Sequence, residues 1–243
     1  MFGFLYGYGI FLQLFAVIHW LRRRPEGFWL WIIILGGGLG ALVYLLVEAL
    51  PDLALIGPTF KVFPRRRRIG ELRKQILDNP APGNYEELGD LLLEDDQPAE
   101  ARAAFDRAIT PRTQDPHPYY GRAQAEIRLG DFGAAVADLE HVLASDGEYD
   151  YHRAAGLYAL ALARSGEVQR AAAAFESATR LSTLSETQFN YAVFLHSQGK
   201  DAEARDWANR ILAKKATLPR YLKRRERPWF RKASGLLKEL PKN

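Results

Sequence analysis

The chain has 243 residues and no cysteine, which excludes disulfide frameworks, zinc–cysteine sites and thiol nucleophiles. Its net charge of +4 combines an acidic centre with basic ends: residues 78–210 carry 12 Lys/Arg against 23 Asp/Glu, and residues 211–243 carry 11 against 2. Because a nucleic-acid site needs a basic face, the acidic centre argues against a nucleic-acid partner.

Two apolar runs, residues 2–21 and 28–47, begin the chain. Both are free of Asp, Glu, Lys and Arg, and each has about the 20 residues that a helix needs to cross a bilayer. Trp20 and Trp29 stand at the ends of the runs, where aromatic residues gather at membrane interfaces. We therefore expect residues 1–50 to form a two-helix transmembrane anchor. The alternative is a pair of buried helices in a soluble domain.

Within the second run, Gly36 and Gly40 have the G-x-x-x-G spacing that lets two membrane helices approach closely. We expect them to pack against the first span, with loose small-residue packing as the alternative. The second run is followed by four consecutive arginines, Arg65, Arg66, Arg67 and Arg68. Because basic residues favour the cytoplasmic side and anionic lipid, we expect this cluster at the surface of the inner membrane, with lipids as a partner and the soluble domain in the cytoplasm.

The stretch from His19 to Asp52 resembles the N-terminal membrane region of phospholipase D-type proteins such as cardiolipin synthases. The likeness is an arginine-rich turn, then tryptophans, then a glycine-interrupted apolar segment that contains Tyr-Leu-Leu near its end. The catalytic signature of that superfamily, H-x-K-x(4)-D, is absent, because none of the five histidines is followed by x-Lys. The resemblance therefore implies an anchor and no phospholipase activity.

From residue 84 onward the chain repeats a pattern of a turn, an alanine, a position four residues later that is usually large and apolar, and an apolar position three residues after that. The repeated alanines are Ala101, Ala135, Ala171 and Ala204, at intervals of 34, 36 and 33 residues. This spacing resembles the tetratricopeptide repeat (TPR), whose period is 34 residues. The resemblance implies an all-α solenoid of helix pairs, which must stack to bury their apolar stripes.

These patterns predict an all-α chain in four parts. Residues 1–50 form the transmembrane hairpin, 51–82 a basic juxtamembrane linker, 83–216 a TPR α-solenoid of four repeats, and 217–243 a basic C-terminal capping helix. A cap is expected because Trp229, Phe230, Leu236, Leu237 and Leu240 recur at helical spacing. The apolar face of such a helix covers the last repeat, and its charged face meets water.

TPR domains bind extended peptides or helices in a groove lined by the first helix of each repeat. Carried onto this sequence by register, the groove positions are Glu86, Asp90 and Glu94 in the first repeat, Tyr120, Gln124 and Arg128 in the second, Arg153 and Arg164 in the third, and Phe189, Val193 and His196 in the fourth. The Lys/Asn set with which some TPR domains clamp a C-terminal carboxylate is missing from these positions. The acidic start of the groove favours a ligand with a basic portion.

No catalytic, cofactor-binding or metal-ligating set is recognisable in the sequence. His141, His152 and His196 belong to different repeats and lack metal-ligand spacing. We therefore expect a scaffold or adaptor, without enzymatic activity or cofactor, that binds a partner protein at the bacterial inner membrane. The alternative is a structural accessory subunit built permanently into a larger membrane protein complex.

Overall fold

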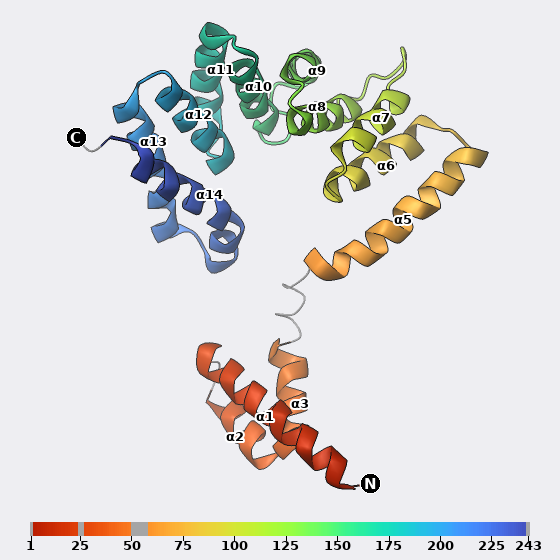
Figure 1. Cartoon of the computed structure of the whole chain (residues 1–243), viewed down its shortest axis with the longest axis vertical. Coiled ribbons are helices and arrows are strands. Elements are labelled where there is room, and N and C mark those ends of the chain that lie inside the picture. The colour runs from red at the N-terminus through yellow and green to blue at the C-terminus, as the bar shows by residue number, and fades with distance from the viewer. Residues whose placement is uncertain (1, 24–26, 50–57, 242–243) are drawn as a thin grey trace. The chain divides into compact units, whose positions relative to one another are not determined.

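The computed structural model describes residues 2–23, 27–49 and 58–241, and every regular element among them is a helix (Figure 1). The chain divides into two compact units, Met1–Arg68 and Ile69–Asn243. Residues 51–57 of the expected linker lie outside the described residues.

The first unit contains α1 (Phe2–Arg23), α2 (Phe28–Leu35), α3 (Gly37–Tyr44) and the π-helical segment η1 (Leu45–Ala49). Two polar side chains of α1, Gln13 and His19, contact its neighbours. Gln13 Nε2 donates to the Ile33 carbonyl oxygen at 2.8 Å, and His19 Nδ1 lies 2.9 Å from Tyr44 Oη. The small apolar core of the unit consists of Ala16, Trp29, Ile33, Ala41 and Tyr44.

The second apolar run is broken where α2 meets α3. Gly37 has a φ of 56°, in the left-handed region that glycine adopts without steric cost. Gly40 crosses α2 so closely that an added Cβ would lie 1.9 Å from the Ile32 carbonyl oxygen. Gly38 is the residue that approaches α1, since an added Cβ there would lie 3.0 Å from Gly9 Cα. The glycines therefore reverse the chain within this run.

The two-span anchor expected from the sequence is wrong. α2 has eight residues and a length of about 12 Å. α3 has eight residues and η1 has five, and together they are about 20 Å long. Both lengths fall short of the roughly 30 Å of a bilayer's hydrocarbon core. Among the residues that the structure describes, no helix combines the length and the apolar character that a membrane crossing requires. The expected inner-membrane location is corrected on the same finding.

Two site assignments depended on the expected spans and lose their basis with them. Gly36 and Gly40 lie at the junction of α2 and α3, where their close contact is with Ile32. Arg65, Arg66, Arg67 and Arg68 lie on helix α5 (Pro58–Asp78). Neither set is retained as a membrane-contacting group.

Large apolar side chains are exposed on the outside of the first unit. Phe11, Trp31, Leu35 and Leu39 each keep more than 60% of their surface accessible. Soluble monomers rarely expose many large apolar side chains together, so exposure of this kind is typical of contact with another molecule.

The second unit confirms the predicted all-helical solenoid. After α5 come four helix pairs: α6 (Pro82–Glu94) and α7 (Pro98–Ala108), α8 (His117–Leu129) and α9 (Phe132–Ser145), α10 (Arg153–Ser165) and α11 (Val168–Leu181), and α12 (Ser185–Ser197) and α13 (Asp201–Thr217). A last helix, α14 (Arg220–Glu239), packs against both α12 and α13.

The repeated alanines lie at the helix crossings. Ala101, Ala135, Ala171 and Ala204 are fully buried, and so is the residue four positions after each of them. A methyl side chain lets the two helices of a pair approach closely, and in three of the pairs the larger side chain one turn later fills the space beside the crossing.

Each helix pair is reversed by one residue with a left-handed backbone. In the last three repeats this residue is a glycine, Gly130, Gly166 or Gly199, with φ between 73° and 90°. In the first repeat it is Asp96, with a φ of 58°. Glycine ends a helix in this conformation without the steric cost that a Cβ would add, and Asp tolerates it better than most residues do.

Helix α5 extends the solenoid at its start, where a linker over residues 51–82 was expected. Leu72 is fully buried and Ile69 nearly so, in a core shared with Leu88 and Leu92 of α6. Their spacing, with the partly buried Ile76, follows one helical face. The second half of α5 therefore covers the first repeat.

Within this unit, the first helix of each pair lies on the inner side of an arc. Figure 1 shows α6, α8, α10 and α12 along that side and α7, α9, α11 and α13 outside them. α14 also lies on the inner side, next to α12. It therefore takes the place that the first helix of a fifth repeat would have.

Candidate protein-binding face

The acidic groove positions of the first repeat face a histidine. His117 Nε2 lies 3.0 Å from Asp90 Oδ2 and 3.9 Å from Glu86 Oε1, and its Nδ1 lies 3.1 Å from Tyr149 Oη. The hydrogen bond to Asp90 raises the pKa of His117, although burial acts in the opposite direction. The structure thus brings Glu86 and Asp90 together, around a group that the sequence analysis did not select and that no motif marks.

Two other groove positions, Tyr120 and Arg153, also lie together. Tyr120 Oη donates to Asp150 Oδ2 at 2.6 Å, and Arg153 Nε donates to Glu186 Oε2 at 2.6 Å. Burial is the largest single effect on the pKa of Arg153 and lowers it, but the hydrogen bond to Glu186 and the charges of Glu186 and Asp150 together raise it, so the net shift is upward. Burial, aided by the bond to Asp150, raises the pKa of Tyr120. These contacts connect α8, the loop after α9, α10 and α12.

The remaining groove positions of the first three repeats are Glu94, Gln124, Arg128 and Arg164. Arg128 Nη1 donates to a backbone carbonyl of α6 at 2.6 Å, and the Arg164 guanidinium lies 5.2 Å from the centroid of the Phe132 ring. Gln124 is half-buried on α8, and Glu94 is exposed at the end of α6. The two arginines therefore hold neighbouring helices together.

The groove positions of the fourth repeat meet α14. The Phe189 ring centroid lies 5.9 Å from that of Trp229, and Lys232 Nζ lies 4.3 Å from the Trp229 centroid and 5.7 Å from the Phe189 centroid. Val193, one turn after Phe189, is 39% exposed. We name Phe189, Val193, Trp229 and Lys232 the α12–α14 surface. His196 lies apart, with its Nδ1 2.6 Å from the carboxylate that begins α13.

The sequence predicts Trp229 as part of a capping helix, and neither Trp229 nor Lys232 is among the expected groove positions. One signal was present. Trp229 precedes Ala233 by four residues, as Tyr85 precedes Gly89 in the first helix of the first repeat. An aromatic residue followed four positions later by a small one therefore marked α14 as a repeat-like inner helix.

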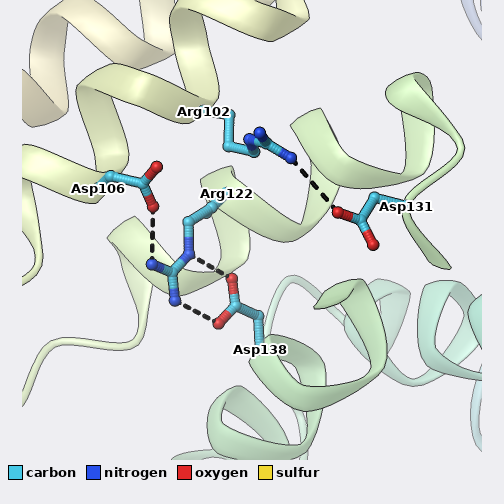
Figure 2. A network of polar contacts seen from close by, with 5 residues as sticks. All are labelled: Arg102, Asp106, Arg122, Asp131 and Asp138. Atoms are coloured by element: carbon cyan, nitrogen blue, oxygen red, sulfur yellow. Dashed lines mark hydrogen bonds and ion pairs between the residues drawn. The ribbon is translucent and has the colours of Figure 1, made fainter. Parts of the chain in front are cut away.

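A network of ion pairs joins the first two repeats (Figure 2). Arg122 of α8 donates to both carboxylate oxygens of Asp138 at 2.7 Å and to Asp106 of α7 at 2.9 Å. Arg102 of α7 lies 3.3 Å from Asp131, which begins α9. The hydrogen bonds to Asp138 raise the pKa of Arg122 despite its burial. The network therefore ties α7, α8 and α9 together.

Glu126 is buried beside this network without a hydrogen bond to its Oε2 atom. It is 5% exposed, and burial together with the neighbouring Asp138 raises its pKa to about 7. The charges of Arg122 and Arg102 act in the opposite direction. A buried carboxylate with so little compensation costs stability whenever it is ionised.

The solenoid has two separate apolar cores. One contains α5 and the first repeat, up to Ala125 of α8. The other runs from Tyr120 of α8 through the later repeats to Leu240, just after α14. The network around Arg122 lies where these cores meet, so polar contacts reinforce that junction.

The inner face provides ion pairs, hydrogen bonds and aromatic contacts. Among the described residues, no group of three or more His, Asp or Glu side chains could hold a metal ion.

Comparison with known proteins agrees with the repeats seen in the structure. A family model described as the tetratricopeptide repeat matches residues 120–186. Residues 120–186 therefore carry tetratricopeptide repeats, and the whole solenoid has a TPR-like fold. The matched residues cover most of α8 and all of α9, α10 and α11, which form two helix pairs. No curated protein is similar enough in sequence to count as a match.

Several solved structures share the fold. YrrB, a TPR protein with an unusual peptide-binding site, has 17% identity and a TM-score of 0.53, over 67% of this chain and 84% of its own. MamA has 19% identity and a TM-score of 0.54, over 61% and 86%. TTC0263, a thermophilic TPR protein from Thermus thermophilus, has 18% identity and a TM-score of 0.54, over 76% and 97%. At these identities the likeness concerns the TPR fold alone.

Proposed function

We propose that the chain is a noncatalytic scaffold whose inner face binds a segment of another protein and recruits that protein into an assembly. The observation that carries the proposal is the placement of α6, α8, α10, α12 and α14 along one side of the solenoid (Figure 1). Side chains from every repeat contribute to one extended surface, which suits a peptide or a helix. The shared fold with YrrB, whose description names a peptide-binding site, supports this use of a TPR solenoid.

Site-specific crosslinking tests the proposal. A photoreactive amino acid is introduced into the full chain at Gln124 or at Val193 on the inner helices, and at Ala137 or Ala173 on the outer helices as matched controls. We expect one partner to crosslink from the inner positions and not from the outer ones. Crosslinks that arise only from Ala137 or Ala173 would contradict the proposal.

A second candidate is a structural subunit held permanently in a larger complex. The exposed apolar side chains of α1, α2 and α3 favour it, because a permanent partner would cover them. Gentle extraction followed by size-exclusion chromatography separates the two candidates. A subunit elutes only with its complex, in fixed proportion, whereas a scaffold is recovered largely alone.

A further inference from the structure

The charges on the N-terminal half of the inner face are paired within the chain. Glu86 and Asp90 both lie within 4 Å of His117, and Arg153 is bound to Glu186. A ligand that pairs with any of these groups must first displace an internal partner. The acidic start of the groove is therefore a poor site for the basic ligand that the sequence suggests.

The cations of α14 are in the opposite situation. Five of them are exposed and make no ion pair with a described residue: Arg225, Arg227, Arg231, Lys232 and Lys238. Exposed cations alone indicate only a solvated surface. Lys232 differs from the others because its ammonium group lies over two aromatic rings, whose faces attract a cation.

Apolar surface lies directly beside this cation. Phe189 and Trp229 are only half-buried, and Val193 extends the same face of α12 by one turn. Apolar and aromatic groups with a neighbouring charge are the usual components of a protein-binding site, in which the apolar centre contributes affinity and the charge sets the preferred partner.

We propose that the α12–α14 surface binds an acidic segment of a partner protein that carries an apolar side chain. The apolar side chain packs against Phe189 and Val193, and a carboxylate pairs with Lys232. The proposal rests on the protein-binding function above and names the chemical class of its ligand.

The charge distribution favours a short acidic segment over a long polyanion. Residues 78–210 carry 12 Lys/Arg against 23 Asp/Glu, so nucleic acid or an anionic vesicle would meet repulsion along most of the solenoid. A short segment contacts only the basic end, where residues 211–243 carry 11 Lys/Arg against 2 Asp/Glu.

Selection from a display library of random short peptides on the immobilised full chain tests this inference. We expect the selected peptides to be acidic and to contain a large apolar residue. In the Lys232→Ala variant their affinity should fall about fivefold, as the loss of one exposed charge pair predicts. Lys215→Ala is the matched control, because Lys215 is an exposed lysine on the outer helix α13, and it should leave the affinity unchanged.

Three results would overturn the inference: selected peptides that are neutral or basic, no enrichment at all, or equal effects of Lys232→Ala and Lys215→Ala. Binding that depends on Lys232 but is seen only with RNA, with phosphatidylglycerol vesicles or with a second copy of the chain would also overturn it. If inner-face crosslinks form but the selected peptides are not acidic, the ligand class fails and the scaffold proposal stands. If acidic peptides bind through Lys232 while crosslinks form only from the outer helices, the scaffold proposal fails and the ligand class stands.

Discussion

At the scale of single residues, Glu126 shows how a helix position can be buried without being satisfied. Its side chain points into the junction of α7, α8 and α9, where Asp138 and Asp131 repel its charge and Arg122 and Arg102 attract it. Both arginines are already bonded to other carboxylates, so Glu126 gains little from either of them. Burial dominates, and the neutral form is favoured up to about pH 7.

We expect Glu126→Gln to stabilise the protein in a pH-dependent way. In the folded protein the pKa of Glu126 is about 7, above its ordinary value of 4.5. The free energy of unfolding therefore falls as the pH rises from 4.5 through 7, because the unfolded chain ionises first. Glutamine cannot ionise, so the gain should be about 1 kcal/mol at pH 5 and about 3 kcal/mol at pH 8. Urea unfolding at both pH values measures it. Glu176→Gln, at an exposed position of α11, is the control, and an equal response of the two variants would refute the explanation.

The partners of charged groove residues could not be predicted from the sequence. Register alone places Glu86, Asp90 and Arg153 on the first helices of their repeats, and the structure has them there. Whether a charge faces solvent or an internal partner depends on residues about 30 positions away, such as His117 for Asp90 and Glu186 for Arg153. No local pattern carries that information.

At the scale of helices, the packing of the first two repeats depends on one aromatic ring. The Phe105 ring of α7 lies against Gly89 of α6 and Gly121 of α8. An added Cβ would lie 2.7 Å from Phe105 Cζ at Gly89 and 2.3 Å from it at Gly121. Two glycines facing one ring allow three helices to meet at that point.

We expect Gly121→Ala to lower the melting temperature. Alanine improves helix propensity by about 1 kcal/mol, but overpacking against a fully buried ring costs about 1–3 kcal/mol. Gly133→Ala on α9 is the control, because an added Cβ there meets no atom within 4 Å. It should raise the melting temperature slightly, since only the gain in propensity applies. A higher melting temperature for both variants would show that the Phe105 ring moves aside at little cost.

The repeat helices were predictable because the repeat places the same small residue at each crossing. The packing of α5 on the first repeat was not predicted, because its four arginines were interpreted as part of a charged linker and the apolar spacing of Ile69, Leu72 and Ile76 was not used. That spacing of three and four residues was present in the sequence.

At the scale of the whole molecule, the apolar N-terminal runs were interpreted by length and composition, and the turn within the second run was not anticipated. Gly37 takes a left-handed conformation and Gly40 packs on the Ile32 carbonyl oxygen, so the run folds back on itself. A G-x-x-x-G spacing is compatible with a continuous helix and with a reversal. Only the backbone conformation distinguishes them.

We expect residues 69–243 to fold as an independent helical unit, because this part of the chain is compact by itself. A fragment of residues 79–243 should be less stable, since it lacks Ile69 and Leu72 of α5. Losing two buried side chains of this size costs about 3–6 kcal/mol. Circular dichroism during thermal unfolding measures both fragments. Equal melting temperatures would show that α5 is only a linker, and failure of the longer fragment to fold would show that the solenoid needs the first unit.

The polar junction between the two apolar cores has a mechanical consequence. Charge pairs at a partly exposed site weaken as ionic strength rises, whereas apolar packing does not. We therefore expect the stiffness of the solenoid around Arg122 to fall as ionic strength rises, as far as the apolar contact of Phe105 with Gly121 across the same junction allows. A bend at this point would change the distance between the two ends of the inner face, and so the length of the segment that can lie along it.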